Sequence, residues 1–419
     1  MSGSPSYLTD GVDTSNMSTI FDMIDRATGE GEVITLTEDM VEAVRVPEGR
    51  NVVIDLGGFT WTAPQGETPI TVEYSTVTLR NGTISGDGNA AIRVGAKDAE
   101  KPTYVTLAQG LTVRAKGHAG VFLSGKGHLD TYADIDVDGE FGCIQGNGSE
   151  PYFGNSATIH GGRLTSKGTA IYWPQEGDLR IYGGELTGVT GVEVRAGTVS
   201  VRGGTITGTA VPTSVTPNGN GSTSLGAGLA IAQHTTMRPV VADISGGTIQ
   251  GYSAVYESNP EGNPAEAVAK VAMDVSGGTM KAVNGGTVAV YAENVRGFVR
   301  GGTFNTPVAT DLVSPGISMT TDADGNTVPA RADWVYPDTG AVTLGMGMKR
   351  LVMTCAKLIY PAGGITMSGM GIRPVCAVAN VPGGASAHVD PVTGAVRLYV
   401  NGAEAEGTLD DVSLIVFGY

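Results

Sequence analysis

Apolar and polar residues alternate in short segments along most of the chain, and a pair of small residues interrupts each segment. Residues 77–84 read VTLRNGTI, and residues 199–206 read VSVRGGTI. Alternation with a period of two sends apolar and polar side chains to opposite faces of a β-strand. Glycine then allows a sharp corner that residues with a Cβ adopt only at a cost. Each phrase therefore predicts a strand, a corner and a second strand.

The phrase recurs with a period in the low twenties. The spacing is 24 residues from Gly57 to Asn81 and 20 residues from Gly183 to Gly203, and longer intervals elsewhere contain extra loop. This period is typical of a solenoid, in which each repeat buries its apolar face only against its neighbours. The LxxLxL pattern of leucine-rich repeats is missing, and no helical segment separates the strands. We therefore predict a right-handed parallel β-helix of about eleven coils over residues 31–306.

The residues before the repeat predict a covered end. Residues 1–16 are rich in Ser, Thr, Gly and Asp, which is typical of a flexible arm or of one that a partner orders. Residues 18–26 predict a short helix, ended by Gly29, with one apolar side formed by Ile20, Phe21, Met23 and Ile24. Within an N-terminal region 1–30, we expect this helix to cap the open end of the solenoid. Docking onto a partner is the alternative.

A different pattern follows the last repeat at Phe304. Residues 307–332 predict a terminal hairpin and a linker, because the run DADGN at 322–326 is a turn signal. Residues 333–419 contain at least four short alternating strands separated by Gly and Pro turns, without the solenoid phrase. This arrangement predicts a small antiparallel β-sandwich. The chain is therefore expected to be all-β, with at least two domains.

Composition narrows the classes of partner. The chain has 419 residues and a formal net charge of −16, and only 16% of its residues are charged. Nucleic acid is an improbable partner, because phosphate binding needs clustered Lys and Arg. No apolar run approaches the roughly 18 to 20 residues of a membrane-spanning helix, so no membrane insertion is expected. The first residues have neither a basic region nor an apolar core, and classical secretion is not indicated.

Cysteine and histidine spacing gives no metal or cofactor signal. Cys143, Cys355 and Cys376 lack CxxC spacing, and buried free thiols are favoured over a Cys355–Cys376 pair. The five histidines show no HxH or HExxH spacing, and neither a GxSxG elbow nor a P-loop is present. We expect no metal site and no cofactor, and glycine-rich stretches are interpreted as corners of coils.

One acidic row is a candidate catalytic site. Asp134, Asp136 and Asp138 alternate with Ile135 and Val137, so they are expected to lie in a row on the outer face of one strand. Carboxylates about 6.5 to 7 Å apart could hold a cation or supply a general acid and base. The alternative, a solvated strand face that resists edge pairing, is favoured.

Aromatic residues and two insertions are candidates for ligand binding. Residues 209–227 and 257–264 lack periodicity and predict exposed loops, where binding usually resides. Aromatic rings can stack on sugars, although packing between coils explains each of them at least as well. The candidates among the aromatic residues are Tyr172, Trp173, Tyr182, Tyr252 and Tyr256, and those in the loops are Asn218, Asn220 and Asn259.

Two parts of the chain resemble proteins of viral and bacterial surfaces. The segments YPAGG at 360–364, DPVTGAVRLY at 390–399 and VSLIVFGY at 412–419 resemble small β-sandwich structural proteins of tailed bacteriophages. This resemblance covers residues 333–419, about a fifth of the chain. Residues 34–56 resemble the opening coil of pectate-lyase-like β-helices found in phage spikes and in surface proteins of gut bacteria.

The resemblance implies a non-enzymatic protein of the bacteriophage virion surface, synthesised in the host cytoplasm. It would be a capsid decoration, a head fibre or a tail spike that attaches to host-surface or environmental glycans. Its partners would be other capsid or tail proteins and further copies of itself, since spikes of this kind are usually homotrimers. Residues 333–419 would then serve oligomerisation or attachment to the particle. A polysaccharide depolymerase with the same fold and a bacterial surface adhesin are the alternatives.

Overall fold

The computed structural model describes most of the repeat region and the strands of the C-terminal region. The described residues are 19–97, 101–150, 154–212, 221–315, 317–329, 334–335, 342–345, 348–359, 365, 374–380, 385–390, 395–400, 403–405 and 408–418. Within these residues, no helix is long and apolar enough to cross a membrane.

Three long sheets of parallel strands dominate the structure, and the strands from β1 to β30 belong to sheets A, B and C in turn. Sheet A consists of β1 (Glu32–Thr35), β4 (Asn51–Asp55), β7 (Thr76–Arg80), β10 (Thr103–Leu107), β13 (Gly127–Thr131), β16 (Ser156–Ile159), β19 (Asp178–Ile181), β22 (Gly197–Val201), β25 (Val240–Ile244) and β28 (Val271–Val275). Sheet C consists of β3 (Val44–Val46), β6 (Ile70–Val72), β9 (Ala90–Val94), β12 (Ala119–Leu123), β15 (Ile144–Gln145), β18 (Thr169–Trp173), β21 (Thr190–Val194), β24 (Ala227–Ala232), β27 (Ser253–Ser258) and β30 (Val290–Ala292).

From β1 to β30, each strand of sheet B lies between a strand of sheet A and a strand of sheet C in the sequence, and sheet B extends further than either. Its parallel strands are β2 (Met40–Val41), β5 (Thr60–Thr62), β8 (Gly82–Gly86), β11 (Leu111–Lys116), β14 (Asp134–Asp138), β17 (Arg163–Ser166), β20 (Glu185–Gly188), β23 (Thr205–Gly208), β26 (Thr248–Gly251), β29 (Thr279–Ala282) and β31 (Thr303–Phe304). The antiparallel hairpin of β32 (Met319–Thr321) and β33 (Thr327–Pro329) then pairs with β31.

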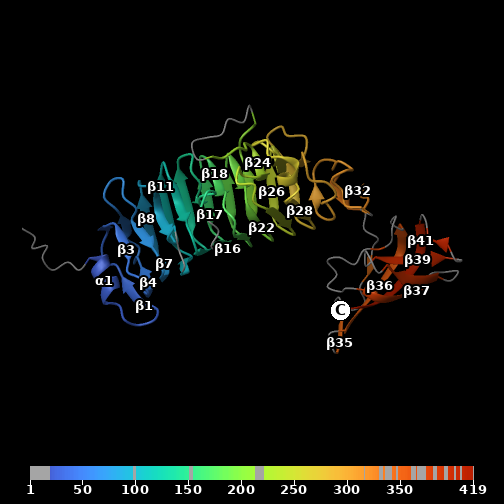
Figure 1. The fold of residues 1–419 in the computed structure, drawn as a ribbon, viewed down its shortest axis with the longest axis horizontal. Helices are drawn as coiled ribbons and strands as arrows, with labels where there is room; N and C mark the ends of the chain where they lie inside the picture. Colours follow the sequence, from blue (N-terminus) through green and yellow to red (C-terminus); the bar gives the residue numbers. More distant parts are fainter. Residues whose placement is uncertain are drawn as a thin grey trace, which may run out of the picture.

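This topology is consistent with a parallel β-helix, the fold class that the repeat predicts. Figure 1 shows the strands of successive turns side by side along a rod, from α1 at the blue end to β32 at the orange end. Sheets A and C have ten strands each, whereas sheet B has eleven parallel strands. The expected count of about eleven coils therefore stays a prediction.

Apolar side chains at equivalent positions of successive turns form the core. Leu186, Ile206, Ile249 and Met280 are direct neighbours in four consecutive strands of sheet B, and all four are fully buried. The period-two alternation of the sequence thus becomes an inner apolar face and an outer polar face. Because the strands pair in exact register, the core residues of one turn lie next to those of the following turn along the rod axis.

The glycine pairs lie at corners between sheets A and B. The second glycine of each pair has a positive φ, 89° at Gly184 and 77° at Gly204. The first glycine often lies against the preceding turn, and a Cβ on Gly203 would overlap the backbone oxygen of Tyr182. Conformation and close approach therefore both require glycine here, as the repeated phrase indicates.

Helix α1 (Ile20–Arg26) covers the core at the first turn, where it contacts β3. Ile20 and Ile24 are fully buried and belong to the same core as the sheets, whereas Phe21 is 43% exposed. The helix ends at Arg26, before the predicted stop at Gly29. One further helical turn, α2 (Ala265–Val268), lies in the connection between β27 and β28.

The described strands of the C-terminal region form two antiparallel sheets. One contains β34 (Trp334–Val335), β35 (Val342–Gly345), β36 (Met348–Ile359), β37 (Pro374–Asn380) and β41 (Thr408–Gly418), and the other contains β38 (Ala385–Val389), β39 (Val396–Val400) and β40 (Ala403–Glu404). Face-to-face packing of the two sheets as a sandwich stays a prediction. Cys143 is buried and free, whereas the side chains of Cys355 and Cys376 lie outside the described part.

Candidate functional site

A row of outward-facing side chains runs along sheet C. The residues in register from β18 to β30 are Tyr172, Glu193, Ala230, Tyr256 and Tyr291. They face outward because the residues that precede them in sequence are core residues, and successive side chains of a strand alternate. The sheet therefore fixes the spacing of these groups along the rod.

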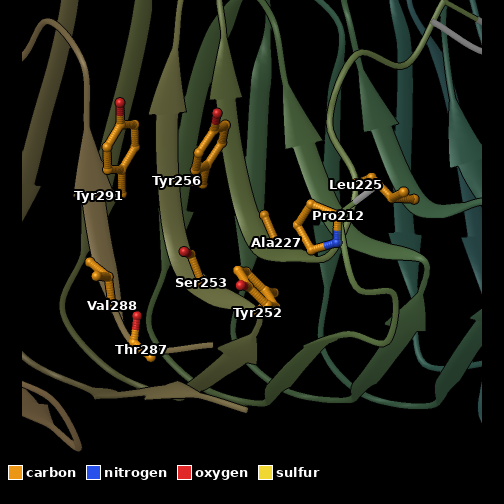
Figure 2. Close-up of a pocket in the computed structure, with 9 residues that line it drawn as sticks. All are labelled: Pro212, Leu225, Ala227, Tyr252, Ser253, Tyr256, Thr287, Val288 and Tyr291. Atoms are coloured by element: carbon orange, nitrogen blue, oxygen red, sulfur yellow. The ribbon is translucent and has the colours of Figure 1, made fainter. Parts of the chain in front are cut away.

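The last two tyrosines of this row line a groove with a volume of about 310 Å³. Their rings stack with centroids 5.2 Å apart and planes 16° from parallel. Figure 2 shows these rings side by side, with Pro212 and Leu225 at the opposite edge of the groove. We call this the sheet C groove, and its lining residues are Pro212, Leu225, Ala227, Tyr252, Ser253, Tyr256, Thr287, Val288 and Tyr291.

The chemistry of the sheet C groove is apolar with scattered hydroxyl groups. None of the described residues that line it is charged, and its polar side-chain groups are hydroxyls of Tyr, Ser and Thr. Burial raises the pKa of Tyr256, so its phenol stays protonated at neutral pH and can donate a hydrogen bond. Tyr291 is 42% exposed and Val288 is 41% exposed, so a ligand can reach the ring stack from solvent.

A buried carboxylate holds one wall of the groove. The connection between β23 and β24, residues 209–226, is here called the insertion, and its described residues include Ser222, Thr223 and Ser224. Glu193 Oε1 accepts hydrogen bonds from Thr223 N at 2.9 Å and from Thr223 Oγ1 at 2.8 Å. Glu193 Oε2 accepts from Ser224 N at 3.3 Å and also from the Ser222 hydroxyl. The insertion is thereby fixed to the outer face of sheet C, which positions the adjoining Leu225.

A buried guanidinium completes this contact. Arg195 is 2% exposed and donates to Gly221 O at 2.6 Å and to Ala232 O at 3.1 Å. It also forms an ion pair with Glu261, and its Nε lies 3.9 Å from Glu193 Oε1. Burial raises the pKa of Glu193, while hydrogen bonds from the insertion and the charge of Arg195 oppose this effect. The buried carboxyl group of Glu193 and the buried guanidinium of Arg195 thus find their hydrogen-bond partners mainly in loop atoms.

The residues predicted to bind ligand have different environments. Trp173 points into the core and is fully buried, and Tyr172 is 4% exposed beneath the insertion, donating to Gly221 O at 3.0 Å. Asn259 braces its own loop, because its Nδ2 donates to Asn263 O and its Oδ1 accepts from Asn263 N, both at 2.9 Å. Asn218 and Asn220 lie outside the described residues. Tyr252 and Tyr256 both line the groove, whereas Tyr182 lies on sheet A's side of the rod.

The acidic row lies on the outer face of β14, as the alternation predicts, since Asp134, Asp136 and Asp138 are exposed. Asp134 Oδ1 accepts from Arg163 N at 2.8 Å, and Asp138 pairs with Lys167. The hydrogen bond from Lys167 lowers the pKa of Asp138. Among the described residues, no group of three or more His, Cys, Asp or Glu side chains could hold a metal ion.

Tyr291, Thr287 and Val288 are lining residues that the sequence reasoning missed. A signal for Tyr291 is present, because Ala-Val-Tyr occurs at 254–256 and again at 289–291. The connection that contains α2 separates the two copies, so the spacing departs from the usual period. Only the register of β27 with β30 shows that these tyrosines are neighbours.

Comparisons with protein-family models, with curated proteins and with solved structures found no match to this chain. The function of this chain is therefore inferred from the geometry of the site and from the chemistry of its side chains.

Proposed function

We propose that this protein is a non-enzymatic structural protein of a bacteriophage virion that binds neutral glycans through the sheet C groove. The stacked rings of Tyr256 and Tyr291, in a groove whose described lining residues are uncharged and bear hydroxyl groups, are the observation that carries this proposal. A sugar ring has apolar C–H faces that pack on aromatic rings and hydroxyl groups that exchange hydrogen bonds with phenols. Because the described lining residues are uncharged, the groove favours a neutral ligand over an acidic one.

The position of the groove supports attachment. Tyr256 lies on β27, which pairs with β24 and β30, and Tyr291 lies on β30, which pairs with β27, so both residues lie on strands rather than on loops. Such residues lose little conformational freedom when a ligand binds, which favours affinity. The insertion forms one wall of the groove, and its length and sequence can change without disrupting the sheet.

The resemblance of residues 333–419 to phage structural proteins supports the virion assignment. The proposed architecture is a right-handed β-helix of about eleven coils, closed by α1 and followed by a C-terminal β-sandwich. This sandwich would mount the protein on the particle as a capsid decoration, head fibre or tail spike, and the assembly would be a homotrimer. The groove would then be presented to host-surface or environmental glycans.

Titration of the full chain with neutral oligosaccharides, selected on a printed glycan array, tests the binding site. We expect Tyr256→Ala and Tyr291→Ala each to weaken binding at least about tenfold, which corresponds to about 1.4 kcal/mol. Tyr291→Phe retains the ring and should lose less. Val33→Ala, an exposed change on β1 at the far end of the rod, is the control and should bind as the wild type does. Unchanged affinity in both Ala variants would refute the groove as the site.

Electron microscopy of purified particles, with a label on either terminus of the protein, tests the virion assignment. A label on the head or on the tail supports it and identifies the anchored end. Particles that consistently lack the protein, while it is abundant elsewhere in the infected cell, would overturn the assignment.

A further inference from the structure

A second set of aromatic side chains lies on the outer face of sheet A, apart from the sheet C groove. Three neighbouring strands of sheet A, β13, β16 and β19, each present two residues on this face, and the residue directly after each strand presents a third. In register from strand to strand, the first positions are His128, Ser156 and Asp178, and the second positions are Asp130, Thr158 and Arg180. The third positions, just after the strands, are Tyr132, His160 and Tyr182. We call these nine residues the sheet A array.

The third positions form a continuous stack of rings along the rod axis. The ring centroids of Tyr132 and His160 are 4.5 Å apart, with planes 5° from parallel, and those of His160 and Tyr182 are 5.9 Å apart. Tyr132 is 44% exposed and Tyr182 is 49% exposed. On the other side of the array, Tyr104 stacks on His128 at 4.9 Å. A stack of three rings on one side and the Tyr104–His128 pair on the other thus flank the polar row of Asp130, Thr158 and Arg180.

The polar row offers charged hydrogen-bonding groups at the centre of the array. Asp130 Oδ1 lies 2.9 Å from His160 Nε2, yet the Asp130 side chain remains 51% exposed. Arg180 pairs with Asp178, and both side chains stay more than a third exposed. Each charged group is therefore held in place by a neighbour and still faces solvent. Charged donors and acceptors form stronger hydrogen bonds to ligand hydroxyls than neutral groups do.

We propose that the sheet A array is a second carbohydrate-binding surface, which takes a neutral, linear glycan lying along the rod axis. This inference extends the proposed glycan-binding function to a separate site of different chemistry. The array combines rings for the apolar faces of sugars with Asp130 and Arg180 for their hydroxyl groups. Two carboxylates against one guanidinium disfavour an acidic polymer, and the overall charge of −16 acts in the same direction. A protein partner is disfavoured by Asp130 and Asp178, because aspartate is depleted in protein interfaces.

Two double variants of the full chain separate this site from the sheet C groove. They are Tyr132→Ala with Tyr182→Ala, and Tyr256→Ala with Tyr291→Ala. Each is assayed on a printed array of neutral, amino and acidic oligosaccharides, followed by calorimetric titration of the strongest binder. We expect the first double variant to lose at least about tenfold in affinity for a set of neutral glycans that the second double variant still binds.

The outcomes distinguish the two proposals. If every glycan signal disappears in the groove variant and none changes in the sheet A variant, the array is not a binding site, while the proposed function stands. If signals disappear only in the sheet A variant, the array stands and the groove does not. Binding of acidic glycans at the array, or of no glycan by the wild type, would overturn the inference.

A further pair of variants guards against a purely structural effect of the ring stack. Arg180→Gln and Asp130→Asn leave all the rings in place, so the melting temperature should stay close to that of the wild type. We expect each to weaken glycan binding at the array severalfold. Unchanged affinity in both variants, with the tyrosines intact, would contradict a role for the polar row.

Discussion

Replacement of Glu193 by alanine should release the insertion from sheet C without unfolding the rod. In the native structure, this fully buried carboxylate accepts the backbone N–H groups of Thr223 and Ser224 and the hydroxyls of Ser222 and Thr223. Alanine removes every acceptor at once and leaves Arg195 with Glu261 as its remaining acidic partner. The rod should survive, because each turn of a solenoid is stabilised mainly by its neighbours and the insertion lies outside the core.

The size of the effect follows from the number of donors left without a partner. Each hydrogen bond to a charged group contributes about 1.5–3 kcal/mol, but released donors regain water once the loop opens. The contributions of the single hydrogen bonds therefore do not simply add. We expect the free energy that keeps the insertion closed to fall by about 3–5 kcal/mol, as for removing one partner of a buried ion pair. This loss corresponds to an equilibrium constant for opening of the insertion that is larger by a factor of about a hundred to several thousand.

Hydrogen–deuterium exchange of the Thr223 and Ser224 amides measures this opening directly. Glu257→Ala is the matched control, because Glu257 is also buried and accepts from Asn294 N at 2.7 Å and from Val295 N at 3.2 Å. The control should speed exchange at 294–295 and leave 223–224 unchanged. If Glu193→Ala folds and the Thr223 and Ser224 amides exchange as in the wild type, the reasoning about Glu193 is wrong.

Two further predictions concern stability. Gly203→Ala should destabilise the rod by about 2–4 kcal/mol in denaturant unfolding, because the new Cβ overlaps the backbone of the preceding turn; Gly161→Ala, with nothing within 4 Å of its Cβ, should change stability by less than about 0.5 kcal/mol. Burial lowers the pKa of His128 below its ordinary value of 6.5, so the unfolded chain binds the proton more readily than the folded one. The free energy of unfolding should therefore fall as the pH drops from 6.5 towards the folded-state pKa of His128. This part of the pH dependence should be missing in His128→Gln. An identical pH profile of unfolding for both proteins would contradict this prediction.

The sequence alone predicted the parallel sheets, because the repeated phrase reflects local requirements of each strand and each corner. Alternation decides which face of a strand a side chain occupies, and the exposed row Asp134, Asp136 and Asp138 follows that rule. The glycine pairs mark the corners, since only a residue without a Cβ fits a position such as Gly203. The short apolar stretch at 20–24 likewise predicted α1.

Contacts between distant segments of the chain determine which outward side chains a ligand can reach. Glu193 and Arg195 alternate with Val192 and Val194 as in an exposed strand, yet the insertion covers both charged side chains. Tyr172 occupies the same outward row as Tyr291, but the first is buried and the second is exposed. Alternation is a property of neighbouring residues, whereas burial of an outer face depends on contacts between segments that are far apart in the chain. The sequence therefore determined the scaffold, and long-range packing on its outer face determined the site.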